Sequence, residues 1–211
     1  MPEAPARHHM VRVDPASWRA HLAGRPDLEG LPLVADWAVR GWPLVVRRPT
    51  GGESGIPLGL PLPPAEGKRR LSFLMEPSAI LSTAPPPRLA AAASAAAAAW
   101  QPTLRRLVDL DPETRTFGSL AWQHLTGLTY LSPTSDIDLL WHLDGSAERL
   151  LAGLAAIDRD APMRIDGECL GAGGMAVQWR ELAEGTPEIM VKDARGVALM
   201  PRADFLAGVG C

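Results

Sequence analysis

The stretch from Phe117 to Trp141 reads "FGSLAWQHLTGLTYLSPTSDIDLLW" and contains a Gly-Ser pair, a long apolar run and two aspartates one residue apart. Alternate residues of a β-strand share a face, so a strand over 137–141 places Asp136 and Asp138 together and their apolar neighbours opposite. Two carboxylates this close repel, and one would take up a proton unless a cation lay between them. Oxygen ligands at this spacing suit Mg²⁺, which commonly binds one or two carboxylates and substrate phosphates.

The Gly-Ser pair supplies features that suit a phosphate group. Gly118 and Ser119 join a strand expected over 114–117 to a helix expected over 119–126. Glycine lets a backbone approach closely, the first N–H groups of a helix lack partners, and the serine hydroxyl adds a donor. A Gly-Ser turn followed by Asp-x-Asp on the next strand resembles the pattern of the nucleotidyltransferase superfamily. There a hydroxyl attacks the α-phosphorus of a triphosphate, although segment 120–135 is longer than is usual between the two motifs.

That superfamily resemblance implies a third carboxylate on a neighbouring strand. In "MRIDGECL", residues 163–170, Asp166 and Glu168 alternate and therefore share one face of a strand. We assign the third position to Asp166, which a glycine follows. A solvated strand face is the alternative interpretation of the same two acids.

Three segments differ in composition, and together they predict an α+β fold. Residues 1–83 have short apolar runs broken by proline and glycine, which indicates a small N-terminal α+β domain for binding a substrate or partner. Within it, "GIPLGLPLPP" is too rich in proline for a central strand. Residues 84–113 form a Pro/Ala-rich linker with helices.

Residues 114–211 are predicted to form a nucleotidyltransferase-like catalytic domain, a mixed sheet with flanking helices on one side. Apolar periodicity gives the expected elements: a helix over 146–158, strands over 163–170 and 176–182, and a hairpin over 188–200 that turns at 194–196.

Composition excludes several classes of protein. The net charge of −3 over 211 residues gives no electrostatic case for a nucleic-acid partner. No apolar run is long enough to span a bilayer, so we expect no membrane association. The two cysteines, Cys169 and Cys211, fit neither a disulfide framework nor a metal motif. A reducing cytoplasm is the expected location.

The sequence of nearly the whole chain, roughly residues 8 to 205, resembles those of the holo-acyl-carrier-protein synthases of malonate decarboxylase, a family of phosphoribosyl-dephospho-CoA transferases. The stretches that carry the resemblance are "PLVADWAVRGWPLVVRR", "GIPLGLPLPPAEGKRRLSF", "AWQPTL", "FGSLAWQHLTGLTYLSPTSDIDLLW", "DAPMRIDGE" and "AVQWREL". The resemblance implies a small N-terminal domain ahead of a nucleotidyltransferase-like domain.

It also implies a reaction. The donor would be 2′-(5″-triphosphoribosyl)-3′-dephospho-CoA, whose 5″-phosphate is joined to a serine of the malonate decarboxylase acyl-carrier protein subunit with release of pyrophosphate. Asp136 and Asp138 then occupy the metal-binding positions for Mg²⁺, Gly118 and Ser119 the phosphate-binding positions, and Asp166, less securely, the third catalytic carboxylate.

The sequence leaves open which basic residues bind the dephospho-CoA part of the donor. The basic run Lys68, Arg69 and Arg70 is assigned to it, and Arg47-Arg48 is a second choice. Basic runs are as often ordinary solvated surface.

Two further functions compete with this hypothesis. One is a nucleotidyltransferase that moves a nucleoside monophosphate to another protein or small molecule, and it would release pyrophosphate from ATP alone. The other is a non-catalytic module that recognises a carrier protein and keeps the aspartates for a structural cation. The intact Asp-x-Asp and Gly-Ser motifs argue against the second.

Overall fold

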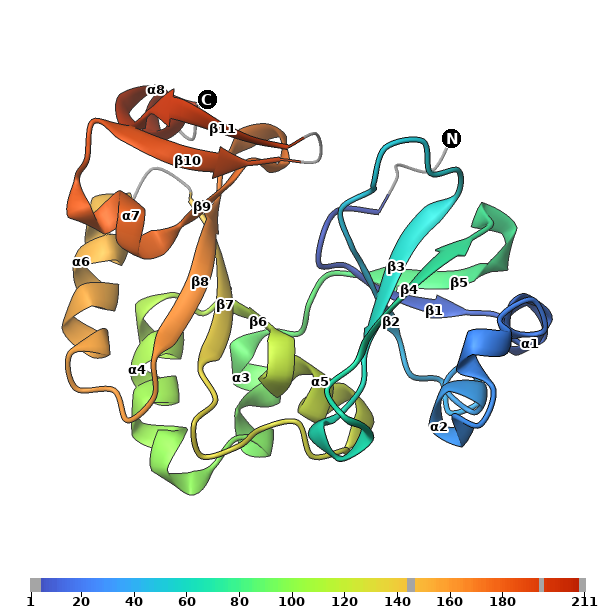
Figure 1. Cartoon of the computed structure of the whole chain (residues 1–211). Helices are drawn as coiled ribbons and strands as arrows, with labels where there is room; N and C mark the ends of the chain where they lie inside the picture. The colour runs from blue at the N-terminus through green and yellow to red at the C-terminus, as the bar shows by residue number, and fades with distance from the viewer. Residues whose placement is uncertain (1–4, 144–146, 194–195, 209–211) are drawn as a thin grey trace. The chain divides into compact units, whose positions relative to one another are not determined.

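A computed structural model describes residues 5–143, 147–193 and 196–208. The chain divides into two compact units, Met1–Pro86 and Pro87–Cys211, and each has its own sheet (Figure 1). Both units combine helices with a sheet, so the predicted α+β class is confirmed.

The first unit is built on a five-stranded antiparallel sheet in the order β4-β3-β2-β1-β5. Two short helices accompany it, and the tryptophans Trp18 and Trp37 lie buried in its core. The elements are β1 (Met10–Val13), α1 (Pro15–Leu22), α2 (Pro32–Ala35), β2 (Leu44–Val46), β3 (Ile56–Pro61), β4 (Arg70–Met75) and β5 (Ile80–Ala84).

The proline-rich strand β3 lies inside this sheet, so the sequence-based exclusion of a central strand was wrong. The backbone N–H of Arg47 donates to the Pro57 carbonyl at 3.0 Å, which turns the polar backbone groups of Pro57 toward β2. Strand β2 has three residues, and its pairing covers Leu58 and Gly59. Pro57 and Pro61 fall outside that short pairing, so their missing donors break no hydrogen bond in the sheet.

The second unit contains a mixed six-stranded sheet in the order β11-β10-β9-β8-β7-β6. Strands β7 and β8 are parallel, and the other neighbours are antiparallel. The elements are α3 (Leu89–Ala92), α4 (Gln101–Leu110), β6 (Arg115–Phe117), α5 (Gly118–Thr126), β7 (Ile137–His142), α6 (Ala147–Asp158), β8 (Ile165–Leu170), β9 (Ala176–Gln178), α7 (Trp179–Glu184), β10 (Glu188–Lys192), β11 (Val197–Pro201) and α8 (Arg202–Ala207).

One face of this sheet meets the helices in a continuous core. Ile137, Leu139 and Trp141 of β7 pack there with apolar residues from every helix of the unit. Residues of the segment 84–113, expected as a linker with helices, enter this core through α3 and α4, while Ala84 ends β5. The opposite face, here called the open face, carries the alternate residues of the same strands.

Segment 176–182 was predicted as one strand, and the structure corrects this. Strand β9 ends at Gln178, where the side-chain Oε1 accepts from the backbone N–H groups of Arg180 and Glu181 and so caps α7. Trp179 then turns into the core. Two predicted positions lie outside the described residues: Ser146, the expected start of the helix over 146–158, and Ala194 in the expected hairpin turn. Strands β10 and β11 pair as that hairpin requires.

Two side chains of α5, Gln123 and Thr126, tie the long connection between α5 and β7 to the helix, and Thr126 Oγ1 accepts from the Leu128 N–H at 3.2 Å. Gln123 Oε1 accepts from the backbone N–H groups of Tyr130 and Leu131, both at 3.0 Å, and its Nε2 donates to the Ala95 carbonyl at 2.6 Å. The added length in 120–135 is therefore ordered and leads directly into Asp136. Among the described residues, no helix has the length and apolar character needed to cross a membrane.

Candidate metal and phosphate site

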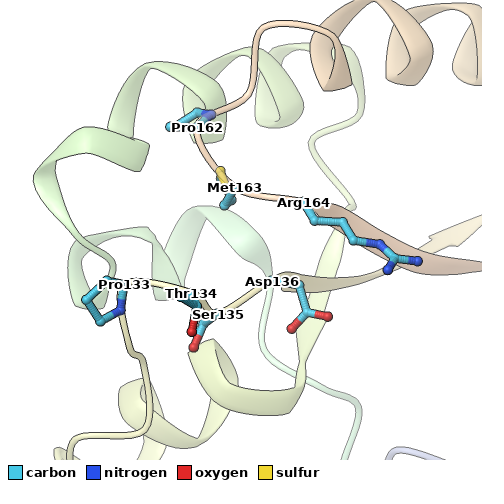
Figure 2. Close-up of a pocket in the computed structure, with 7 residues that line it drawn as sticks. All are labelled: Pro133, Thr134, Ser135, Asp136, Pro162, Met163 and Arg164. Carbon is cyan, nitrogen blue, oxygen red and sulfur yellow. The ribbon is translucent and has the colours of Figure 1, made fainter.

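The two parallel strands β7 and β8 begin side by side, and a pocket lies where they begin (Figure 2). The backbone N–H of Ile137 donates to the Arg164 carbonyl at 3.0 Å, which joins the two entering segments. Residues 133–136 and 162–164 line the pocket. Asp136 belongs both to this pocket and to the acidic group described next.

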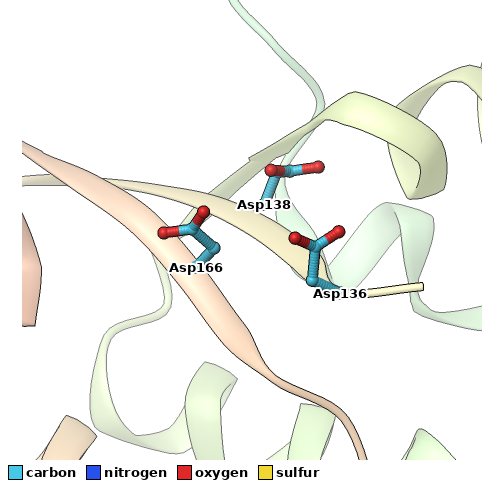
Figure 3. Close-up of side chains that lie close together, drawn as sticks. All are labelled: Asp136, Asp138 and Asp166. Carbon is cyan, nitrogen blue, oxygen red and sulfur yellow. The ribbon is translucent and has the colours of Figure 1, made fainter. Parts of the chain in front are cut away.

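Three aspartates come together on the open face. The parallel register sets Asp138 opposite Asp166, and Asp136 stands two residues before Asp138. Figure 3 shows the three side chains lying close together. One carboxylate oxygen from each lies within 4.8 Å of the others, and all three residues are at least partly exposed. Sequence reasoning named these three residues, and parallel pairing is what joins them.

Two hydrogen-bond donors hold the Asp166 carboxylate, and both donate to the same oxygen. The backbone N–H of Gly167 donates to Oδ1 at 2.9 Å, and Gln178 Nε2 donates to it at 3.0 Å. The other end of the Gln178 amide must be its oxygen, because two backbone N–H groups of α7 point at it. Within the described part of the chain no donor reaches Asp166 Oδ2, so that oxygen has one lone pair for a cation and a second that can accept a proton.

Gly118 gives the acids room. Its φ is +61°, a left-handed conformation that L side chains rarely adopt. A Cβ built at this position would lie 1.8 Å from Asp138 Oδ2, so no other residue fits without moving that carboxylate. Strand β6 pairs Phe117 with Asp138, which sets the start of α5 beside the acids. Ser119 is half-buried in the first turn of that helix.

Glu168 follows Asp166 on the same face, and its surroundings differ. Its residue is only 6% exposed, and Lys192 Nζ lies 3.5 Å from its Oε1. An ammonium group at that distance compensates a buried carboxylate. Asp166 joins the acidic group, whereas Glu168 is paired with a lysine of β10.

The acidic group fits Mg²⁺ chemically. All its donors are carboxylate oxygens, which hard cations such as Mg²⁺ prefer over nitrogen and sulfur ligands. Three like charges this close raise each other's energy unless a cation compensates them. Asp136, Asp138 and Asp166 are the residues that would hold the ion.

The basic residues assigned to the substrate lie in the first unit. Lys68, Arg69 and Arg70 are all exposed at the turn before β4 and at its first residue. Arg47, the second choice, is engaged by Glu53: Nη1 donates to Oε2 at 2.9 Å and Nη2 contacts Oε1. Hydrogen bonds from Arg47 and the Thr50 backbone lower the pKa of Glu53 to about 2.

Two residues at this site were missed by sequence reasoning. Gln178 was placed in a strand, and glutamine is not among the residues that typically mark a helix start. Arg164 carries no motif and became visible only through the pocket beside Asp136. Either residue could have been identified from the sequence only if the strand pairing had already been known.

Comparison with protein families covers both units. Residues 6–86 match the phosphoribosyl-dephospho-CoA transferase MdcG N-terminal domain. Residues 88–203 match the phosphoribosyl-dephospho-CoA transferase MdcG C-terminal domain. No solved structure gives a significant match.

Curated relatives extend over nearly the full chain. A phosphoribosyl-dephospho-CoA transferase of Bradyrhizobium diazoefficiens is 44% identical over 97% of this chain and 93% of its own. Transferases of the same description from Xanthomonas campestris pv. campestris and Xanthomonas euvesicatoria pv. vesicatoria are each 36% identical, over 93% of this chain and 94% of theirs. The chain therefore belongs to the phosphoribosyl-dephospho-CoA transferase family and is an enzyme with that activity.

Proposed function

We propose that this transferase joins the 5″-phosphate of 2′-(5″-triphosphoribosyl)-3′-dephospho-CoA to a serine of the malonate decarboxylase acyl-carrier protein subunit, using Mg²⁺. The observation that carries the proposal is the meeting of Asp136, Asp138 and Asp166 beside the start of α5. That arrangement suits phosphoryl chemistry in a chain whose family transfers a phosphoribosyl-dephospho-CoA group. Family membership indicates which group is transferred, and the three aspartates are the proposed site for the metal ion that binds its phosphates.

The chemical step is a displacement at the α-phosphorus of the donor. The serine Oγ forms a bond to phosphorus, the bond from phosphorus to the bridging oxygen of pyrophosphate breaks, and pyrophosphate leaves with that electron pair. The serine proton passes to Asp166, whose rotation is fixed by Gly167 and Gln178. Bound Mg²⁺ supplies charge neutralisation for the triphosphate.

The phosphate-binding role falls to the first turn of α5. At Gly118 the backbone can lie close to a phosphate, and the Ser119 hydroxyl can donate to it. The positive end of the helix dipole adds a favourable field for an anion. These groups hold the leaving pyrophosphate in our proposal.

Lys68, Arg69 and Arg70 are proposed to bind the dephospho-CoA part of the donor or the carrier protein. Their support is charge and exposure: three cations stand together on the surface of the first unit. Reversing all three charges should weaken binding of one of these substrates in a salt-sensitive way and leave metal binding intact.

The test is the intact mass of the carrier subunit. After incubation with donor, Mg²⁺ and enzyme, its mass should rise by one phosphoribosyl-dephospho-CoA group, and pyrophosphate should appear in equal amount. Chelation of the metal should stop both. A mass gain from ATP alone would instead indicate transfer of a nucleoside monophosphate, and no gain from either donor would contradict the proposal.

A further inference from the structure

The pocket at the start of β7 and β8 has no role in the proposed chemistry so far, and its size suits a ligand. Its volume is about 370 Å³, within the range of roughly 300 to 1,000 Å³ typical of small-molecule pockets. Pro133, Pro162 and Met163 form its apolar part, and Thr134, Ser135 and Arg164 add polar groups. Figure 2 shows these residues with Asp136 at the edge.

The pocket is built on ordered backbone. Met163 belongs to the hydrophobic core and is only 7% exposed. The Ser132 backbone N–H donates to Ser135 Oγ at 2.9 Å, and the Ser135 N–H donates to the Ser132 carbonyl at 3.1 Å. Arg164 is fixed through its carbonyl by Ile137, while its side chain is exposed. The walls are therefore preformed, which lowers the cost of binding.

Its position relative to the acids decides what it could hold. In the sheet, β7 lies between β6 and β8. Gly118 follows β6, which pairs with β7 on the edge away from β8, and the pocket lies between the starts of β7 and β8 with Asp136 in its lining. In phosphoryl transfer the attacking and leaving oxygens stand roughly in line on opposite sides of phosphorus. If pyrophosphate leaves toward Gly118, the attacking hydroxyl comes from the pocket side.

The charges in the pocket favour the acceptor over the donor. Arg164 is the one cationic residue among those that line it, and the one carboxylate, Asp136, belongs to the proposed metal site. A polyanionic donor gains little from such a surface. A peptide segment suits it, because its side chains can pack on the prolines, its backbone can use the hydroxyls, and an acidic or carbonyl group can meet Arg164.

We infer that this pocket binds the segment of the carrier protein that bears the acceptor serine, and so delivers its hydroxyl to Asp136 and Asp166. The inference rests on the proposed function and adds the place where the protein substrate docks. Its volume exceeds what one serine side chain fills, so it also takes residues beside the serine and contributes to the choice of carrier.

Two variants test this on the complete enzyme. Thr134→Trp fills the pocket from an exposed position, and Arg164→Ala removes its cation. Arg159→Ala is the matched control, since Arg159 is also exposed, lies in the same unit, and its loss changes the net charge equally. Initial rates are measured by varying carrier at saturating donor and donor at saturating carrier, and binding of unmodified carrier is measured without donor.

Arg164→Ala should raise the carrier KM and weaken carrier binding roughly tenfold, the effect of losing one hydrogen bond to a charged group. Thr134→Trp should weaken carrier binding at least as much, because the indole occupies the space of the bound segment. The donor KM and the melting temperature should stay as in the unaltered enzyme, and Arg159→Ala should change none of these. A rise in donor KM with carrier KM unchanged would assign the pocket to the donor and overturn the inference. Unchanged carrier binding in both variants would also overturn it, while absence of transfer by the unaltered enzyme would contradict the proposed function as well.

Discussion

The two faces of strands β7 and β8 differ in what they contribute to the protein. On the core face, Ile137, Leu139 and Ile165 are fully buried, and each such side chain stabilises the fold by about 1.5–3 kcal/mol relative to an exposed one. On the open face, Asp138 and Asp166 stand close to each other and to Asp136. Carboxylates at that spacing oppose folding when no cation is bound. In these strands the odd-numbered apolar side chains thus stabilise the fold, and the even-numbered aspartates form the candidate site.

The largest effect is expected on the open face. Asp136→Ala and Asp138→Ala should each abolish transfer, because the proposed metal site loses one of its three carboxylates. Thermal stability without metal should hold or rise, since one like charge is removed. Transfer assays and melting curves check both parts, with Asp109→Ala as an exposed acid of α4 outside the site. Near-normal transfer by either variant in Mg²⁺ would contradict the metal assignment.

A change behind the core face should give the opposite result. Leu154 of α6 is fully buried in the cluster that covers this face. Leu154→Ala should lower the free energy of unfolding by about 2–5 kcal/mol through lost burial and the cavity left behind. Transfer per folded molecule should stay near normal below the melting temperature. A loss of activity without a loss of stability would break the division between the two faces.

Two glycines at the ends of α5 sharpen the comparison. Gly118 and Gly127 both have positive φ, at +61° and +73°, but a Cβ meets Asp138 only at Gly118 and finds nothing within 4 Å at Gly127. Alanine at either position should cost about 1–2 kcal/mol of stability from the left-handed backbone. Only Gly118→Ala should also displace Asp138, and so weaken Mn²⁺ or Mg²⁺ binding and transfer. Equal metal affinity in the two variants, measured by calorimetry, would argue against a role for the close approach.

The smallest effect concerns the orientation of Asp166. Gln178→Glu keeps an acceptor for the N–H groups of α7 but replaces the amide donor to Asp166 with a carboxylate oxygen. The helix cap should be kept, because carboxylates also cap helices, but the melting temperature without metal should fall, because the new carboxylate faces Asp166. Metal affinity should change by about tenfold, as expected for one hydrogen bond to a charged group.

In that variant an added carboxylate could attract the ion as well as misplace Asp166, so a second substitution is needed. Gln178→Leu removes the donor without adding charge, and it should weaken metal binding while it also loses the cap. Unchanged metal affinity in both variants would show that Gln178 serves only the helix.

Local patterns were sufficient where the physical rule is local. Alternation along one strand places Asp136 and Asp138 on one face, and a glycine before a helix start is a property of a few adjacent residues. Local sequence patterns gave wrong predictions where residues distant in the chain determine the local structure. The prolines of β3 are tolerated because β2 is short, and Trp179 starts a helix because its side chain enters a core made by other elements.

The sequence by itself determined the α+β class, the Asp-x-Asp and Gly-Ser motifs and the family, since these depend on residue order and spacing. The sequence favoured Asp166 over Glu168, but only the tertiary structure separated their surroundings, because parallel pairing of β7 with β8 sets Asp166 opposite Asp138 while Lys192 lies beside Glu168. The tertiary structure alone brought Gln178 to Asp166 and placed a pocket beside Asp136. Contacts between residues far apart in the chain depend on strand register and packing, which local spacing does not encode.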